Sequence, residues 1–431
     1  MSTSQMIQEL ITTIKTDETA IKNSDIINVI LKTLRYLNPN FIDHGERTAY
    51  LAYLLFEANV LSPKIERKPL LLLSLFHDIG AFKSETFDEY LLTNDTNTTP
   101  HAVYGYLFLK HFSPLGNYAE SILYHHVPYK NLKRYNSSYQ HYTEVIYLVD
   151  RIDVWMQQYD NETVLYQLNV NRHTFNETLL TAFLQLNQKK NILEQIRTKK
   201  YEVFTRQLYH LLQLSNHEIY DYLMTLLYTA DFKSEQTVTH TISNASISLT
   251  LAELLNVSPN DYPAIYLGAL LHDIGKLAIP PEILESKQRL STTEMATMRD
   301  HVYYTNEIIK DIVSDEILKI AIRHHERLDG SGYPYGLTEK DLSFNEQIVA
   351  CADVFSALIS CRSYKPPFKK ENVIEILTLL KESYHLNALI CETIIEHYDV
   401  IVDVSNALSE PILRKYYSLS SEYKIKSKTA L

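Results

Sequence analysis

Histidine and aspartate residues of metal-binding type occur in the same order in the two halves of this sequence. The first set is His44, His77, Asp78, His101, His125, His126 and Asp150. The second set is His240, His272, Asp273, His301, His324, His325 and Asp353. The first histidine precedes the His-Asp pair by 33 residues in one set and by 32 in the other. The matching order and spacing indicate an internal duplication.

The chemistry of these side chains points to divalent metal ions. Neutral imidazole nitrogens and carboxylate oxygens suit Fe, Mn, Zn and similar ions. A lone histidine on an apolar helix face is usually a core or surface residue, but seven such groups repeated in order are better explained as ligands. An aspartate next to a histidine can bridge two metal ions while the histidine binds one of them. Two ions held in this way lower the pKa of a shared water molecule and clamp phosphoryl oxygens.

Helices are expected to hold these side chains, because the apolar residues recur with helical spacing. In 26–37, IINVILKTLRYL, they form one stripe with spacings of three and four. Similar stripes occur at 47–60, 102–112, 143–156, 241–256, 303–313, 346–361 and 371–381. Only 9 of the 431 residues are glycine, which disfavours a turn-rich β protein and a Gly-rich phosphate loop. We therefore expect an all-α fold.

The length of the chain suggests two or three domains, at roughly 100 to 200 residues each. The charged stretch 186–208 lacks proline and glycine. It is either a helical connector between two bundles or the last helix of the first bundle. We expect an N-terminal domain at 1–195, a helical connector at 196–225 and a catalytic domain at 226–431.

Composition narrows the classes of partner. A net charge of −11 argues against binding a nucleic-acid polymer, although a few local cations still allow a small anionic ligand. The three cysteines form no C-x-x-C pair, which fits a reducing compartment. The N-terminus lacks the apolar core of a signal peptide, and no apolar run approaches the ~20 residues that span a bilayer. We expect a cytoplasmic protein that does not enter a membrane.

Three segments of the second half resemble a known family. They are HDIGK at 272–276, HHERLDGSGYP at 324–334 and ADVFSALISCRSYKP at 352–366. Together they resemble the HD-GYP subgroup of the HD metal-dependent phosphohydrolases, bacterial phosphodiesterases that open cyclic dinucleotides. The resemblance covers roughly residues 235–368 and implies HD-type helical bundles in tandem.

The resemblance assigns roles to residues of the second set. The implied metal ligands are His240, His272, Asp273, His301, His324, His325 and Asp353, with Asp273 as the bridge. Asp273 and Lys276 would be catalytic, and the substrate would contact Lys276, Tyr333, Arg362 and Lys365. Some members have a glutamate one helical turn before the first histidine, which helps to hold a third metal. Here that place is Gln236, and Glu235 is aimed about 140° away, so we expect two divalent ions, Fe or Mn above others.

The first set departs from this pattern around its ligands. All seven ligand types are present, but Ala81 stands where the second set has Lys276, and YHHVPYKNLKRY replaces the GYP segment. Asp153 is an alternative to Asp150 as the last ligand; we prefer Asp150, because VDRIDV then aligns with ADVFSA. A second metal site is expected here, either regulatory or at an interface. An HD domain before an HD-GYP domain resembles the bacterial 3',3'-cyclic GMP-AMP phosphodiesterases.

The resemblance implies hydrolysis of 3'-5' cyclic dinucleotides, 3',3'-cyclic GMP-AMP or cyclic di-GMP, to a linear dinucleotide through a metal-bridging hydroxide. Two alternatives stay open. One is a receptor that binds cyclic dinucleotides without cutting them, and the other is an HD nucleotidase that uses the N-terminal copy. Besides the substrate, a second copy of the chain is a candidate partner.

Overall fold

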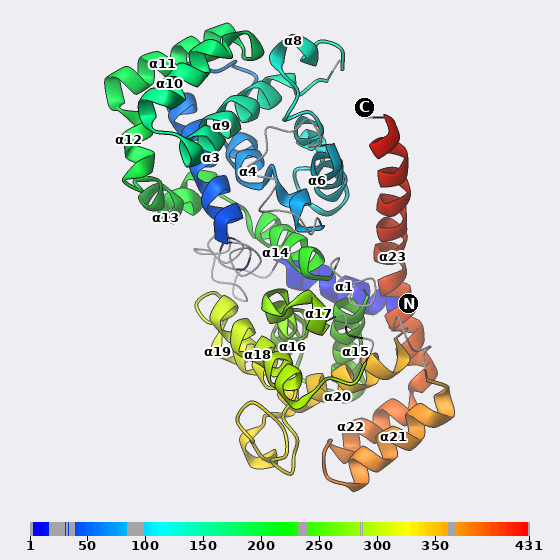
Figure 1. The fold of residues 1–431 in the computed structure, drawn as a ribbon. Coiled ribbons are helices and arrows are strands. Elements are labelled where there is room, and N and C mark those ends of the chain that lie inside the picture. Colours follow the sequence, from blue (N-terminus) through cyan, green and yellow to red (C-terminus); the bar gives the residue numbers. More distant parts are fainter. Residues whose placement is uncertain are drawn as a thin grey trace. The chain divides into compact units, whose positions relative to one another are not determined.

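The structure is a computed structural model that describes residues 3–16, 31, 33, 39–83, 99–135, 137–231, 239–284, 286, 288–360 and 368–429. These residues form helices joined by short connections (Figure 1). Within the described part of the chain, the only extended pairing is an isolated bridge between Asp329 and Thr338. The expectation of an all-α fold is confirmed.

The chain divides into two compact units. The N-terminal unit comprises Leu34–Leu214 and Ser418–Leu431, and the C-terminal unit comprises Ser215–Tyr417 and Met1–Thr33. The predicted domain limits at 195 and 225 stay a prediction. No helix in the described ranges is both long enough and apolar enough to cross a membrane.

The N-terminal unit is built from short and medium helices. They are α3 (Pro39–Glu57), α4 (Arg67–Phe76), η1 (Ile79–Lys83), α6 (Thr99–Phe112), η2 (Gly116–Tyr118), α7 (Glu120–Leu123), α8 (Tyr129–Leu132), α9 (Gln140–Gln158), α10 (Asn161–Val170), η3 (Arg172–Thr174), α11 (Glu177–Lys190), α12 (Ile192–Arg197) and α13 (Tyr201–Leu212). Helix α4 is central, because all its residues from Pro69 to Phe76 are buried.

The charged stretch 186–208 belongs to this unit. It covers the end of α11, all of α12 and most of α13. Helix α12 buries Ile192, Leu193 and Ile196, and α13 packs on α3. These are apolar contacts within the unit. The connector and last-helix interpretations of the stretch both stay predictions.

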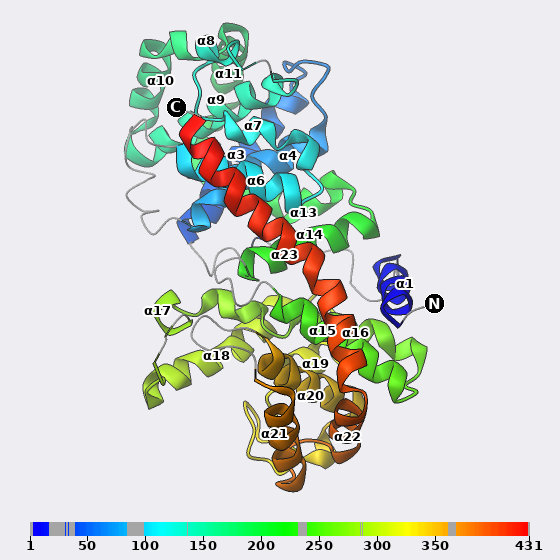
Figure 2. The ribbon, with the colours of Figure 1, turned by 90° about the vertical axis from the view of Figure 1, so that its right-hand side faces the viewer.

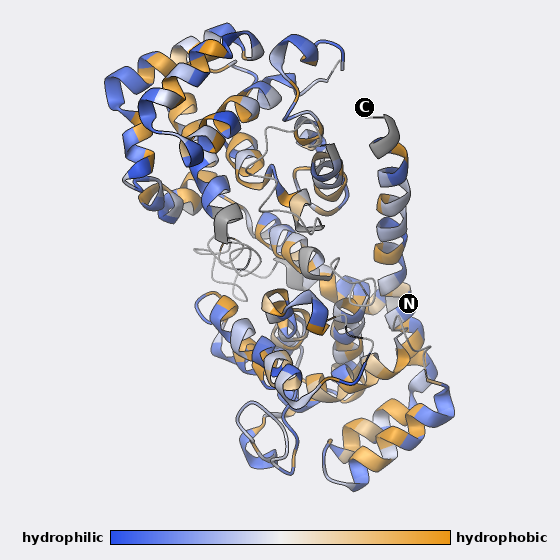
Figure 3. Ribbon diagram, in the orientation of Figure 1, coloured by the Kyte–Doolittle hydropathy of each residue, from blue (hydrophilic) through white to orange (hydrophobic). Residues whose placement is uncertain are grey.

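The C-terminal unit has its own set of helices. They are α1 (Thr3–Thr16), α14 (Asn216–Asp231), α15 (His240–Leu254), η4 (Pro259–Asp261), α16 (Tyr262–Leu271), η5 (Ile274–Ala278), α17 (Pro281–Leu284), α18 (Thr292–Ile309), α19 (Asp315–Ile322), η6 (Glu339–Asp341), α20 (Phe344–Ile359), α21 (Lys370–Glu382), α22 (Ala388–Glu396) and the part of α23 (Tyr398–Thr429) up to Tyr417. Figure 2 shows α15, α16 and α20 to α22 from a second side. Many helices carry hydrophobic and hydrophilic residues together (Figure 3).

Local sequence signals set where some of the helices that carry the repeated histidines and aspartates begin. Helix α18 begins with a capping box of Ser291 and Glu294, and α20 begins with one of Ser343 and Glu346. The packing pairs are equivalent in the two units: α3 contacts α4 and α9 as α15 contacts α16 and α20. Likewise, α6 contacts η1 as α18 contacts η5. The duplicated sequence thus forms duplicated scaffolds.

Candidate metal centres

The His-Asp pair sits at the end of a buried helix in both units. His77 caps the C-terminus of α4, and His272 caps that of α16. A Cβ atom on Gly80 would lie 2.0 Å from the carbonyl oxygen of His101, and one on Gly275 would lie 2.0 Å from that of His301. Only glycine permits this approach. It brings the aspartate against the helix that carries the next histidine.

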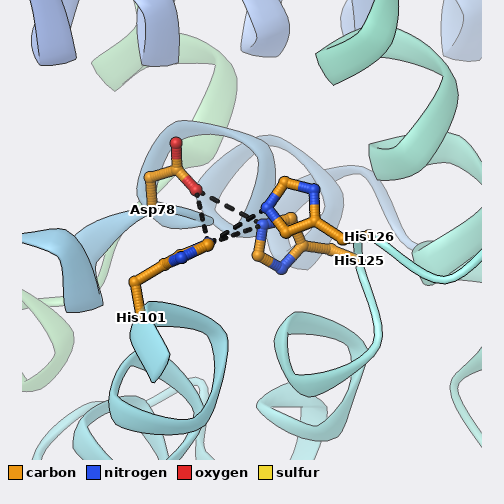
Figure 4. A group of neighbouring side chains, drawn as sticks. All are labelled: Asp78, His101, His125 and His126. Carbon is orange, nitrogen blue, oxygen red and sulfur yellow. Dashed lines mark hydrogen bonds and ion pairs between the residues drawn. The ribbon is translucent and has the colours of Figure 1, made fainter. Parts of the chain in front are cut away.

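In the N-terminal unit the seven predicted residues converge, and we call them the N-terminal cluster. Asp78 lies beside His101, His125 and His126 (Figure 4). Its Oδ1 atom is 3.3 Å from Nε2 of both His101 and His125. Its Oδ2 atom is 3.7 Å from Nε2 of His44 and 3.6 Å from Nε2 of His77. The two oxygens of Asp78 therefore face two separate groups of histidines.

A second carboxylate, Asp150, completes this cluster. Its Oδ1 atom lies 3.4 Å from Nε2 of His44, and its Oδ2 atom lies 3.5 Å from Nδ1 of His126. Asp153 instead accepts a hydrogen bond from Nδ1 of His44 at 2.7 Å, on the side of the ring away from the cluster. The structure thus places Asp150, the residue preferred from the sequence, among the histidines.

The seven residues of the second set form the C-terminal cluster with the same pattern. Asp273 Oδ2 lies 3.1 Å from Nε2 of His272 and 3.7 Å from Nε2 of His240. Asp273 Oδ1 lies 3.5 Å from Nε2 of His301 and 4.0 Å from Nε2 of His324. One aspartate again faces two groups of histidines.

Asp353 takes the place that Asp150 has in the other unit. Its Oδ1 atom is 3.2 Å from Nε2 of His240 and 3.5 Å from Nε2 of His272. Its Oδ2 atom is 3.9 Å from Nδ1 of His325. Each cluster therefore combines five histidines with two carboxylates that each reach both sides.

Backbone carbonyls orient the imidazole rings. Nδ1 of His272 donates to the carbonyl oxygen of Ala269 at 2.7 Å, and His301 and His324 make the same bond, also at 2.7 Å, to the residue three before each. In the N-terminal cluster His77 donates in this way to Ser74 at 2.8 Å. With the Nδ1 proton committed, Nε2 presents a lone pair.

Several of these Nε2 atoms lie close to one another, an arrangement that bound cations would satisfy. The Nε2 atoms of His44 and His77 lie 3.0 Å apart, although both rings donate through Nδ1. The Nε2 atoms of His301 and His324 lie 3.5 Å apart in the same situation. Nε2 of His272 and Oδ1 of Asp273 are buried without hydrogen bonds. The donor set and these unsatisfied atoms suit divalent metal ions.

The electrostatics of the clusters support the same conclusion. Burial by itself would raise the pKa of Asp273, but the imidazole of His272 and the ammonium of Lys276 hold it well below its usual range. Burial lowers the pKa of His301 to about 4 and that of His325 to about 3. Burial also opposes charge on His272, yet Asp273 raises the pKa of that ring to about 10. The ionised carboxylate of Asp273 and the neutral rings of His301 and His325 are the ligand forms that metal ions require. His272, in contrast, would release a proton when a metal ion binds.

Comparison with known proteins now identifies the scaffold. Residues 41–155 and residues 226–388 each match a family model described as an HD domain. The chain belongs to the HD domain family. It carries the domain twice, and the expected tandem of HD-type bundles is confirmed.

Relatives of this two-HD-domain chain are known. A 3'3'-cGAMP-specific phosphodiesterase of Vibrio cholerae is 29% identical over 372 residues, which are 81% of this chain and 85% of that protein. A cyclic di-GMP phosphodiesterase response regulator of Xanthomonas campestris is 39% identical over 130 residues, which are 30% of this chain and 34% of that protein. A solved cyclic GMP-AMP-specific phosphodiesterase of Vibrio cholerae aligns with a TM-score of 0.53 at 18% identity, over 90% of this chain and 98% of that chain. This last likeness shows a shared fold.

The two HD domains differ in the charges beside their clusters. In the C-terminal HD domain, Nζ of Lys276 lies 2.5 Å from Asp273 Oδ2, and a quarter of the lysine side chain is exposed. In the N-terminal HD domain the equivalent residue, Ala81, is buried. A cation is nevertheless present there, since Arg151 donates to Asp150 Oδ2 at 2.8 Å. The cation thus lies beside the second carboxylate in the N-terminal HD domain and beside the central aspartate in the C-terminal one.

The GYP segment of the C-terminal HD domain folds against its cluster. The ring of Tyr333 packs on that of His325 with centroids 4.6 Å apart, and the guanidinium of Arg299 lies 4.7 Å from the Tyr333 centroid. Buried Glu326 accepts hydrogen bonds from the backbone N–H groups of Tyr335 and Leu337, at 2.8 and 2.9 Å. The loop is thereby fixed beside the exposed edge of the cluster.

Gly332 lets the same loop close tightly, because a Cβ atom there would lie 2.4 Å from the backbone nitrogen of Arg327. Arg362 and Lys365, the expected phosphate-binding cations, lie outside the described residues, as do Gln236 and Glu235.

Sequence reasoning missed several residues that support the clusters. They are Arg47, Arg151, Arg299 and Glu326. Arg47 lies three residues after His44, a helical spacing that would have suggested proximity. Arg299 offers no such signal, because its contact with Tyr333 joins α18 to a loop that follows α19.

Proposed function

We propose that this chain is a metal-dependent phosphodiesterase that hydrolyses 3'-5' cyclic dinucleotides, and that its C-terminal HD domain carries out the reaction. The product would be a linear dinucleotide, and the substrates would be 3',3'-cyclic GMP-AMP, cyclic di-GMP or both. The observation that carries the proposal is the lysine ammonium paired with the central aspartate of the C-terminal cluster. The named activities of the relatives support it.

The ligands divide into two groups that suit two ions, Fe or Mn being the metals we expect. One group is His240, His272, Asp353 and the Oδ2 atom of Asp273; the other is His301, His324, His325 and the Oδ1 atom of Asp273. When bound, two such ions supply a nucleophile from water near neutral pH and a clamp for phosphoryl oxygens.

The remaining groups of the chain would position substrate and balance charge. Lys276 stands beside the central carboxylate with part of its side chain exposed, so its ammonium is available to a phosphate oxygen as negative charge develops. Tyr333 covers one face of His325 and would contact the ligand at the open edge. Arg362 and Lys365 would bind the second phosphate.

A turnover assay tests this function against the alternative of a non-hydrolytic receptor. Purified protein supplied with Mn²⁺ or Fe²⁺ is incubated with 3',3'-cyclic GMP-AMP and, separately, with cyclic di-GMP, and linear products are resolved by chromatography. Metal content is measured on the same preparation. We expect metal-dependent formation of linear dinucleotide from at least one substrate. Tight binding of both without any product, in protein that carries its metals, would favour the receptor.

A further inference from the structure

The two clusters differ in what lies behind their first histidine. In the N-terminal HD domain, Nδ1 of His44 donates to Asp153 at 2.7 Å, and Asp153 also accepts two bonds from Arg47, at 2.6 and 2.9 Å. In the C-terminal HD domain, Nδ1 of His240 lies 3.3 Å from the hydroxyl of Ser356. Asp153 and Ser356 hold equivalent places, each three residues after the second carboxylate of its cluster. A charged partner therefore replaces a neutral one.

The charged partner strengthens the histidine as a ligand. A carboxylate that accepts the Nδ1 proton fixes the ring and its tautomer and makes Nε2 more basic. Asp153 is itself buried, and the two hydrogen bonds from the Arg47 guanidinium hold its carboxylate in place behind the His44 ring. Partners of this kind change metal affinity by about 10- to 100-fold.

The N-terminal cluster is also the more closed of the two. The side chains of His44 and Asp150 are 0% and 2% exposed, whereas those of the equivalent His240 and Asp353 are 13% and 11% exposed. Release of a metal ion requires water or a chelator to reach its ligands. Closure and a charged partner therefore act in the same direction, toward slower release.

We propose that the N-terminal cluster is a metal-retaining centre, which binds divalent ions more tightly than the C-terminal cluster and stabilises the N-terminal HD domain. Arg47 and Asp153 are positioning residues for this centre, because they act through His44. The inference concerns metal retention alone, so it stands or falls separately from the proposed phosphodiesterase activity.

A chelator titration tests this difference in the full-length protein. Protein loaded with Zn²⁺ is exposed to increasing EDTA, desalted, and its zinc per chain measured by mass spectrometry. We expect two equal classes of zinc, with the retained class requiring about 10- to 100-fold more chelator. His272→Ala should keep the retained class, and His77→Ala should keep the labile one.

Asp153→Asn tests the cause, because it preserves size and an acceptor for His44 while removing the charge. It should make the retained class as labile as the other, and the matched variant Ser356→Ala should change neither class by more than a few-fold. Melting temperature in excess Zn²⁺ checks that the variants fold. If Asp153→Asn does not fold, zinc retention in the wild type and in His272→Ala still shows whether the N-terminal cluster holds the retained class.

Three results would overturn the inference. One is a single class of zinc in the wild type, and another is loss of the retained class in His272→Ala. The third is retention that persists in folded Asp153→Asn.

Discussion

Replacing Lys276 by methionine is expected to lower kcat by about 10²- to 10³-fold. The side chain is a preplaced cation, with Nζ 2.5 Å from Asp273 Oδ2 and three-quarters of its surface covered. Removing one preorganised group from developing charge costs about 2.7–4 kcal/mol of barrier, which gives this factor in rate. The ion pair is partly exposed and contributes at most about 1 kcal/mol to folding. The effect should therefore appear in catalysis and not in stability.

The assay measures initial rates of linear dinucleotide formation at saturating Mn²⁺, with metal content determined on the same sample. Lys310→Met is the matched control, because Lys310 also pairs with a carboxylate three residues away, Glu307 at 2.7 Å, but on the surface. The control should keep the wild-type rate. Unchanged kcat in Lys276→Met, or loss of its metal together with activity, would refute the role of the ammonium.

Further predictions concern the loop, the scaffold and pH. Glu326→Gln should raise KM several-fold and lower the free energy of unfolding by about 1–3 kcal/mol. The reason is that the buried carboxylate accepts hydrogen bonds from two backbone N–H groups of the loop and loses its charge in the variant. Unchanged steady-state kinetics and an unchanged urea midpoint would contradict this. Gly275→Ala should destabilise the protein by roughly 4 kcal/mol or abolish folding, because its Cβ would lie 2.0 Å from the carbonyl oxygen of His301. A variant that unfolds at the same urea concentration as the wild type would contradict this close packing. In metal-free folded protein, burial lowers the pKa of His301 to about 4, so this ring stays neutral below pH 6.5. The same histidine in the unfolded chain gains a proton near pH 6.5. The free energy of unfolding should therefore fall as the pH drops from 6.5 toward 4. This residue should lower the free energy of unfolding by about 2 kcal/mol between pH 7 and pH 5. Urea unfolding in EDTA measures the change, and a free energy of unfolding that does not fall over this range would contradict the lowered pKa.

The sequence predicted the all-α fold and the candidate ligands, because both depend on residue spacing. Helical periodicity at 47–60 and 241–256 marks α3 and α15, and the order of histidines and aspartates is copied in both halves. The choice of Asp150 over Asp153 followed from aligning the two copies, and the structure places Asp150 in the cluster.

Contacts between distant elements could not be predicted in the same way. The stacking of Arg299 on Tyr333 and the bonds of Glu326 to the loop depend on the path of the chain between helices. The transfer of the cation from the Lys276 position to Arg151 was also missed, because the two residues occupy different places in the repeat.

The central claim is that the C-terminal cluster, and not the N-terminal one, cuts cyclic dinucleotides. The most direct measurement compares linear product formed by His272→Ala and by His77→Ala, which remove equivalent ligands from the two clusters. The account predicts that His272→Ala loses turnover while folded His77→Ala retains it. Turnover that survives in His272→Ala and disappears in folded His77→Ala would contradict the account and assign the chemistry to the N-terminal HD domain.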